Sequence, residues 1–470
     1  MAGADGRSEV TGTGRRGWTS LAHRTRNGGA CIAVLLALCA VGAARAQPPQ
    51  AQLPQVQPPQ ARFPQAQPAK SPQPRSRAVK AEPRGAPKLL AFSAEETERI
   101  LIHGPWPPQP VGTLVRDPGN ALTGLPEAVA LGQRLFFERR LSPAGVSCAH
   151  CHQPGKDFAD GLARSRGVAE LDRNAPSLWN AVHERWQGWD GAADSLWSQA
   201  IRPLLDPREM ASSAERLQAE LALQPALAAG WRRVFGQEVR AQEPQAVLVG
   251  TAKLISAYVA TLVSPRTPFD EFRDALARRD RAAAARYPLS AQRGLQLFVG
   301  RGNCQLCHGG ARFTHGEFAD IGLRFFVRPG VVDAGRHGGI EALRASPYNL
   351  LSRWADAPPP GQPDEAVKTR HVEATHRNFG EFKVPGLRQV ARTAPYMHDG
   401  QLTTLEAVVR HYSELNLERL HADGEQVLRP LRLSPQEAQD LLAFLRTLTA
   451  QSPARSKASQ PQAVNRAAAR

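Results

Sequence analysis

The sequence predicts a mainly α-helical protein. Apolar residues recur at helical spacing over long segments such as 246–263, whereas the alternating apolar and polar pattern of strands is scarce. Ser434-Pro435-Gln436-Glu437 has the pattern of a capping box with proline at the first helical position, ahead of apolar residues at 441, 442, 445 and 448. The fold class is therefore mainly α.

A short internal repeat divides the chain into two halves. Leu131-Gly132-Gln133-Arg134-Leu135-Phe136 is echoed by Arg293-Gly294-Leu295-Gln296-Leu297-Phe298. Further on, Ala257-Tyr258-Val259-Ala260-Thr261-Leu262 is echoed by Ala443-Phe444-Leu445-Arg446-Thr447-Leu448. Each half is thus expected to open and close with a helix, which indicates one plan used twice.

Between these helices, each half contains two cysteines followed at once by a histidine. The motifs are Cys148-Ala149-His150-Cys151-His152 and Cys304-Gln305-Leu306-Cys307-His308. Such a motif can hold haem covalently, because the thiols form thioethers with the vinyl groups and the imidazole ligates the iron. One zinc site built from both C-x-x-C pairs is the alternative, but it leaves both histidines unexplained. We expect two covalently bound haem c groups, in two cytochrome c-like domains with one haem each.

The segments outside the two halves indicate export and flexible connections. Basic residues precede an apolar run from Ala30 to Val41, which contains Cys31 and Cys39, and Ala44-Arg45-Ala46 follows it. Residues 1–46 are therefore predicted to be a signal peptide cleaved near Ala46, which places the mature chain in the periplasm. The other predicted segments are a disordered Pro/Gln-rich linker, an N-terminal domain, a C-terminal domain and a disordered tail, at 47–87, 88–285, 286–449 and 450–470.

The charge distribution argues against a nucleic-acid partner. The net charge of the chain is +16. Most of this excess lies in the two terminal stretches, 1–88 and 450–470, so residues 89–449 are close to neutral. A nucleic-acid-binding domain would carry its basic excess in the folded part.

Several motifs in a fixed order resemble the bacterial di-haem cytochrome c peroxidases and their MauG-like relatives. The resemblance covers roughly residues 92–449. Its motifs, besides the two C-x-x-C-H sites, are Arg173-Asn174-Ala175-Pro176, Trp189-Asp190-Gly191, Phe382-Lys383-Val384-Pro385-Gly386-Leu387-Arg388 and Thr393-Ala394-Pro395-Tyr396-Met397-His398-Asp399-Gly400. It implies a haem-dependent oxidoreductase of the cytochrome-c peroxidase type that acts on hydrogen peroxide.

In this resemblance the first haem, on His152, is the peroxidatic one. Glu209 matches the distal acid that assists cleavage of the peroxide bond, and Gln199 and Pro203 fall at matching spacings after Trp189. Trp189 matches the tryptophan that relays an electron between the haems. Without the resemblance, Glu209 reads as a surface helix residue and Trp189 as a packing residue.

Respiratory members of the family also carry a distal histidine that blocks the first haem at rest. Here the stretch 153–182 contains no histidine, and His183 is too close to Trp189 to match. The resemblance therefore predicts a five-coordinate, high-spin iron that needs no reductive activation.

The second haem, on His308, is expected to transfer electrons and to need a second axial ligand. Counting from His398, the family's ligand position falls on Tyr412, and MauG has an axial tyrosine there. A phenolate would stabilise oxidised iron. Tyr412 also lies on an apolar helical face, so a place in the core, ligation by His411 or Met397, and an open site all stay open.

The resemblance further implies one calcium ion at the domain junction. Asn174 and the backbone carbonyls of Thr393 and Pro395 match the family's site, and oxygen donors suit Ca²⁺.

The sequence thus predicts a periplasmic di-haem c-type peroxidase that reduces hydrogen peroxide with electrons from a small redox protein, a cytochrome c or a cupredoxin. The alternative is a MauG-like enzyme that uses peroxide to oxidise or cross-link side chains of a partner protein. A non-enzymatic di-haem electron carrier is the second alternative. The resemblance also allows a homodimer.

Overall fold

The computed structural model describes residues 88–108, 115–324, 326–328, 330–420 and 427–451. The predicted signal peptide, the Pro/Gln-rich linker up to residue 87 and the tail from residue 452 lie outside these ranges. None of the helices in the described ranges combines the length and the apolar composition that a membrane crossing requires.

The described residues are mainly helical, as the sequence predicted. The α-helices are α1 (Ala94–Leu101), α2 (Pro126–Phe137), α3 (Cys148–Cys151), α4 (Leu196–Leu205), α5 (Ala214–Leu223), α6 (Pro225–Phe235), α7 (Pro244–Val259), α8 (Pro268–Ala277), α9 (Arg281–Ala284), α10 (Leu289–Val299), α11 (Arg336–Ala345), α12 (Ala366–His371), α13 (Leu405–Ser413) and α14 (Pro435–Thr447). Strands β1 (Phe318–Ala319) and β4 (Phe382–Lys383) form one small antiparallel sheet, and β2 (Phe326–Arg328) and β3 (Val331–Val332) form another.

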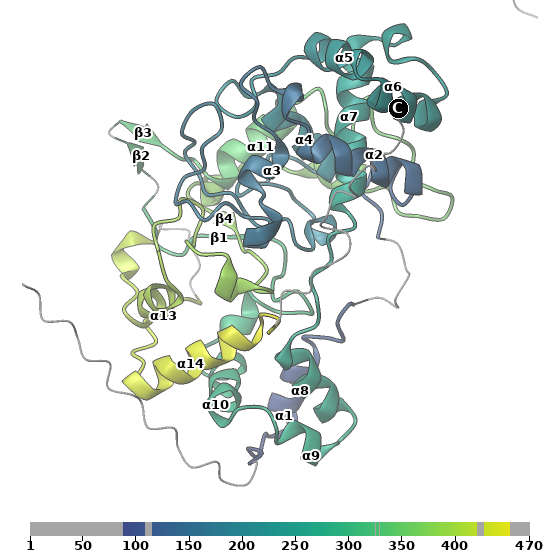
Figure 1. The fold of residues 1–470 in the computed structure, drawn as a ribbon. Coiled ribbons are helices and arrows are strands. Elements are labelled where there is room, and N and C mark those ends of the chain that lie inside the picture. Colours follow the sequence, from purple (N-terminus) through teal and green to yellow (C-terminus); the bar gives the residue numbers. More distant parts are fainter. Residues whose placement is uncertain (1–87, 109–114, 325, 329, 421–426, 452–470) are drawn as a thin grey trace, which may run out of the picture. The chain divides into compact units, whose positions relative to one another are not determined.

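The internal repeat corresponds to two helix crossings. Helix α2 packs against α7, and α10 packs against α14 (Figure 1). A Cβ atom on Gly132 would lie 1.9 Å from the carbonyl oxygen of Leu254, and one on Gly294 would lie 1.9 Å from that of Asp440. Each repeat therefore supplies a glycine at the point where two helix backbones nearly touch.

The sequence predicted the start of α14 correctly, but not the end of α7. The capping box before α14 is formed, since the Ser434 side chain accepts from the Glu437 N–H and the Glu437 side chain accepts from the Ser434 N–H. By contrast, α7 ends at Val259, although the apolar pattern runs on to residue 263. In the turn that follows, Ala260 and Leu262 are buried whereas Val263 is exposed, so the apolar pattern beyond Val259 does not continue the helix.

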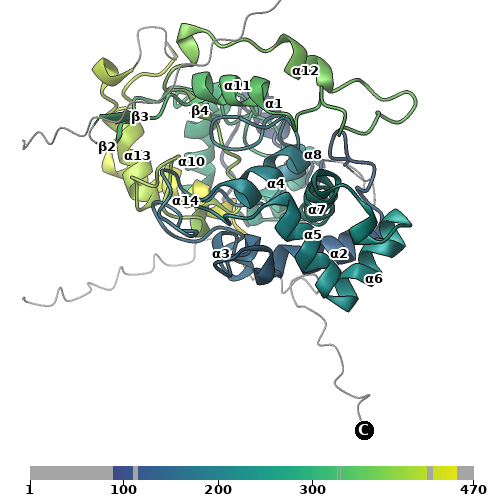
Figure 2. The same cartoon turned by 90° about the horizontal axis from the view of Figure 1, so that it is seen from above.

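Two apolar clusters form the interior of the described residues. The first gathers around α7 and includes side chains of α2, α4, α5 and α6; Figure 2 shows α5 beside α7 and α6 beside α2. The second gathers around α10 and α14. Ile100 of α1 and Phe269 and Phe272 of α8 belong to the second cluster, although they precede residue 285. The domain division at 285 stays a prediction, and cluster membership does not follow it.

Candidate functional site

A single cavity, with a volume of about 800 Å³, is lined by both C-x-x-C-H motifs. The site residues proposed from the sequence also line it, although they come from many separate segments of the chain. These lining residues are Cys148, Cys151, His152, Asn174, Trp189, Gln199, Pro203, Glu209, Cys304, Cys307, His308, Thr393, Pro395, Met397 and Tyr412.

The histidines of both motifs are held in the orientation that a haem ligand needs. Nδ1 of His152 lies 3.0 Å from the Phe158 carbonyl oxygen, and Nδ1 of His308 lies 3.0 Å from that of Phe313. A carbonyl can only accept, so Nδ1 carries the proton and Nε2 keeps its lone pair for a metal. Burial lowers the pKa of His152, and it lowers that of His308 to about 4, so both imidazoles are neutral.

The cysteines fit covalent haem attachment rather than zinc. All four are free thiols, half-buried in the cavity wall. Within the part of the chain that the structure describes, no three His, Cys, Asp or Glu side chains gather to hold a metal ion. Since both C-x-x-C pairs are described, their four thiols do not come together as one zinc site.

Two residues that the sequence analysis missed provide the carbonyls for these histidines. Phe158 and Phe313 both adopt left-handed backbone angles, with φ of 58° and 59°. Such angles are unfavourable for a bulky residue and persist where the surroundings fix them. Phe158 is the sixth residue after His152 and Phe313 the fifth after His308, so no common spacing points to the pair.

The backbone at Glu209, whose side chain lines the cavity, is held by a close contact with residues 167–169. The N–H groups of Val168 and Ala169 donate to the carbonyls of Glu209 and Arg208, at 3.0 and 2.9 Å. A Cβ atom on Gly167 would lie 2.6 Å from the Glu209 oxygen, so only glycine allows this approach. The pKa of the Glu209 carboxyl is raised from 4.5 to about 7, mainly by burial and also by Asp206, although Arg202 and Arg208 oppose this increase.

Helix α4 carries the two other residues predicted near Glu209. Ser195 caps its N-terminus by accepting from the Ser198 N–H. Gln199 and Pro203 stand four positions apart and so lie on the same face of the helix, and both line the cavity. The Pro203 carbonyl accepts from the Met210 N–H at 3.1 Å, which joins the end of α4 to the segment that contains Glu209.

Trp189 is fixed by hydrogen bonds to two other motifs. Its indole Nε1 donates to the Asn174 carbonyl at 2.9 Å, and its own carbonyl accepts from the Lys383 N–H at 2.8 Å. Beside it, Arg173 forms ion pairs of 2.7 Å with both Asp190 and Asp333. Burial opposes ionisation of Asp190, but Arg173 and Arg202 together hold its pKa below the usual value.

The three candidates for the second axial ligand are placed differently. Tyr412 of α13 lines the cavity near Cys304 and Cys307, and burial raises the pKa of its phenol. Met397 also lines the cavity. His411 is not among the described lining residues, and its Nε2 lies 2.9 Å from the carbonyl oxygen of Ile321. Of the three candidates, Tyr412 and Met397 line the cavity, and His411 is therefore not placed to reach a haem bound there.

Asn174, Thr393 and Pro395 present oxygen atoms of the kind that Ca²⁺ binds. The Asn174 side-chain nitrogen donates to the Leu162 carbonyl at 2.6 Å, which leaves its Oδ1 as a free acceptor. Within the described ranges, this Oδ1 and the carbonyls of Thr393 and Pro395 accept no hydrogen bond. Such amide and carbonyl oxygens are suitable Ca²⁺ ligands.

Sequence comparison identifies relatives over most of the chain. Residues 126–277 match the family model described as di-haem cytochrome c peroxidase. The methylamine utilization protein MauG of Methylorubrum extorquens is 38% identical over 335 residues, which is 71% of this chain and 80% of MauG. The cytochrome c551 peroxidase of Pseudomonas aeruginosa is 30% identical over 326 residues, 69% of this chain and 79% of that protein.

Solved structures give a similar result. A MauG-like protein associated with microbial copper homeostasis aligns with a TM-score of 0.54 at 27% identity, covering 76% of this chain and 99% of that protein. The diheme peroxidase BthA of Burkholderia thailandensis aligns with a TM-score of 0.54 at 26% identity, covering 69% of this chain and 86% of BthA.

Proposed function

Because the chain belongs to the family of di-haem cytochrome c peroxidases and MauG proteins, which are haem-dependent oxidoreductases, we propose that it cleaves hydrogen peroxide at the His152 end of its cavity. The observation that carries this proposal is the position of Glu209. Its carboxyl, with a pKa of about 7, lines the cavity that the Cys148-Ala149-His150-Cys151-His152 motif also lines.

The family implies haem c as the cofactor, and the neutral His152 and His308, with the free thiols beside them, would hold one group each. Haem bound there would supply an iron that binds peroxide at one end and a store for electrons at the other. The histidines that line the described cavity are His152, His308 and His398. His183 lies instead along a second cavity beside Trp186. This placement supports a first haem whose far side is open.

We assign the proton transfer to Glu209. As a carboxylate it takes the proton from the attacking oxygen of peroxide, and it returns that proton to the other oxygen, which leaves as water. A pKa near 7 suits both directions at neutral pH, because neither protonation state is strongly favoured. Gln199 and Pro203 border the same space and would keep peroxide close to the carboxyl.

Trp189 is the proposed electron relay between the two ends of the cavity. Its indole lines the space that both motifs share, and the bond to the Asn174 carbonyl prevents the ring from turning. If the calcium ion binds through Asn174, it would stabilise the same segment and thus the relay.

Tyr412 is the proposed second ligand at the His308 end. It lines the cavity near Cys304 and Cys307, whereas His411 is not among the described residues that line this cavity. Tyr412→Phe should therefore change the low-spin absorption and electron paramagnetic resonance signals, while Met397→Leu should leave them as in the wild type. An unchanged spectrum in Tyr412→Phe, with a changed one in Met397→Leu, would transfer the role to Met397.

The family also implies a protein partner, as an electron donor or as a substrate. We propose a small periplasmic redox protein as the donor. Oxidation of a partner protein, as in MauG-like chemistry, is the second candidate, and the placement of Tyr412 favours it, because a phenolate ligand would stabilise oxidised iron.

Spectra of the diferric protein, taken before and after one equivalent of hydrogen peroxide, test the proposal. We expect one high-spin and one low-spin haem, followed by a rapid change on addition of peroxide. Fast recovery with a reduced cytochrome c or cupredoxin would support the donor-dependent peroxidase, whereas a long-lived oxidised state would support the MauG-like reaction. Two low-spin haems that do not respond to peroxide would reject both and leave an electron carrier.

A further inference from the structure

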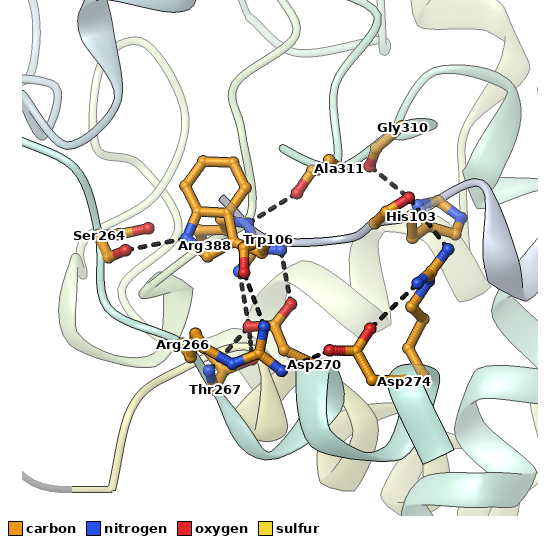
Figure 3. A network of polar contacts seen from close by, with 12 residues as sticks. His103, Trp106, Ser264, Arg266, Thr267, Asp270, Asp274, Gly310, Ala311 and Arg388 are labelled. Atoms are coloured by element: carbon orange, nitrogen blue, oxygen red, sulfur yellow. Dashed lines mark hydrogen bonds and ion pairs between the residues drawn. The ribbon is translucent and has the colours of Figure 1, made fainter. Parts of the chain in front are cut away.

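His103 lies next to the second C-x-x-C-H motif, although it precedes the first motif in the sequence. It follows α1 and is fully buried. Its Nδ1 lies 3.1 Å from the carbonyl oxygen of Gly310, two residues after His308. Because a carbonyl only accepts, Nδ1 is the donor. Figure 3 shows His103 and Arg388 directed at the neighbouring carbonyls of Gly310 and Ala311.

The rest of the His103 ring lies among aromatic side chains. It stacks on Phe313, with ring centroids 4.6 Å apart and planes 9° from parallel. Phe298 and Phe269 approach it edge-on, at 5.9 and 6.3 Å. Its Nε2 is buried and has no hydrogen-bond partner in the described residues. Burying Nε2 without a partner costs free energy, and an apolar side chain would avoid this cost. The hydrogen bond from Nδ1 to the Gly310 carbonyl is therefore the interaction that requires a histidine at this position.

The residue under this ring is the one that orients His308. Phe313 accepts from Nδ1 of His308 through its carbonyl, and its backbone is in the left-handed region. Such a conformation persists only where the surroundings fix it. His103 contributes to this at two points, the Gly310 carbonyl and the Phe313 ring.

Arg388 supports the same segment from the other side. Its Nε donates to the Ala311 carbonyl at 2.7 Å, and its guanidinium lies 3.9 Å from the Trp106 ring centroid. It pairs with Asp270 at 2.8 Å, and both side chains are only 2% exposed. The segment 310–313 is therefore held between the chain that follows α1 and a buried ion pair.

We propose that His103 is a positioning residue for the second haem, which holds the Phe313 carbonyl against Nδ1 of His308 and thereby keeps the reduction potential low. A firm bond from Nδ1–H to a carbonyl raises the basicity of the imidazole, and a more basic ligand favours oxidised iron. The inference rests on the proposed role of His308 as a haem ligand.

The test is a redox titration of the two-haem protein with three variants. His103→Phe keeps an aromatic ring over Phe313 but removes the donor, and His103→Asn keeps a donor but removes the ring. His183→Phe is the matched control. The His183 ring is half-buried, and its centroid lies 6.3 Å from that of Trp106, which follows His103 in the chain. Within the described residues, His183 makes no hydrogen bond to the segment 310–313.

We expect His103→Phe to shift the reduction equilibrium of the second haem at least tenfold towards the reduced form, about 59 mV for one electron. The first haem should keep its potential. His103→Asn and His183→Phe should stay within threefold of the wild type. If His103→Phe does not take up two haems, His103→Leu, which also lacks the donor, replaces it.

Two results would overturn the inference. One is a wild-type potential of the second haem in His103→Phe or His103→Leu, and the other is a shift in His103→Asn as large as that in His103→Phe. The haem content of the wild type is measured first. Fewer than two haems would contradict the proposed function itself, and that failure is distinct from a failure of the role of His103.

Discussion

The two halves of the molecule share one way of orienting the histidines of their C-x-x-C-H motifs, but they stabilise it differently. In the first half a nearby residue supplies the main support: Trp179 donates to the Asp157 side chain at 3.0 Å and packs edge-on against Phe158, with ring centroids 5.0 Å apart. Arg392 adds a longer ion pair to Asp157, at 3.6 Å. In the second half His103 and Arg388 come from distant segments. Both halves therefore have the same backbone arrangement at Phe158 and Phe313, but different residues support it.

The halves also differ in the side chain that lines the cavity near each motif. The first half supplies a carboxyl, Glu209, whose raised pKa suits proton transfer. The second half supplies a buried phenol, Tyr412, which suits ligation. This difference would give the two haems unequal tasks.

Removing the carboxyl of the first half should have the largest effect. Glu209→Gln should slow peroxide cleavage by about 10²–10⁴-fold, because the amide cannot carry a proton. Stopped-flow absorbance with peroxide measures this, and Glu220→Gln on α5 is the control. A loss below threefold would reject the role of Glu209, while a changed low-spin spectrum would show that the halves are not independent.

The same carboxyl should set the pH dependence of the first half. As the pH falls below about 7, Glu209 becomes protonated and kcat/KM should fall about tenfold per pH unit. Since its pKa is raised from 4.5 in the folded state, its contribution to stability should be lost as the pH rises through about 7.

Asp206→Asn sharpens this pH prediction. Asp206 raises the pKa of Glu209, so the variant should shift the limb of the pH profile to lower pH. In Glu209→Gln the limb should disappear. If the Glu209→Gln variant still shows a limb near pH 7, that limb belongs to another titrating group.

Alanine at the two crossing glycines tests whether the halves are structurally equivalent. Gly132→Ala and Gly294→Ala should each lower the free energy of unfolding by about 1–3 kcal/mol, because the new Cβ meets a helix carbonyl. Denaturant titration measures this. Gly155→Ala is the control, since nothing lies within 4 Å of its Cβ position. A loss from only one of the two crossings would break the equivalence.

The smallest effect is expected at the local support of the first half. Trp179→Phe loses the hydrogen bond to Asp157, which contributes about 0.5–1.5 kcal/mol. It should shift the reduction potential of the first haem and leave that of the second unchanged, whereas His103→Phe should affect only the second haem. Shifts at both haems in either variant would mean that the supports are shared.

The sequence indicated the mainly helical fold correctly, and the site residues that it proposed line one cavity in the structure, while their roles stay predictions. The repeat was visible because Gly132 and Gly294 stand in similar hexapeptides, and in the structure each glycine meets the backbone of a partner helix. Glu209 and Trp189 were found through motif order, since their own surroundings in the sequence are ordinary. His411 and Tyr412 are adjacent in the sequence, and only the structure separates them, because Tyr412 lines the cavity and His411 is not among the described lining residues.

By itself, the sequence determined the chemistry of attachment, because a C-x-x-C-H motif places two thiols and an imidazole together within five residues wherever the chain goes. Only the tertiary structure decided how those imidazoles are oriented. The carbonyls of Phe158 and Phe313 depend on left-handed backbone angles, and His103 reaches its partner across more than two hundred residues of chain. Such contacts form when distant segments pack together, and they leave no periodicity or spacing in the sequence.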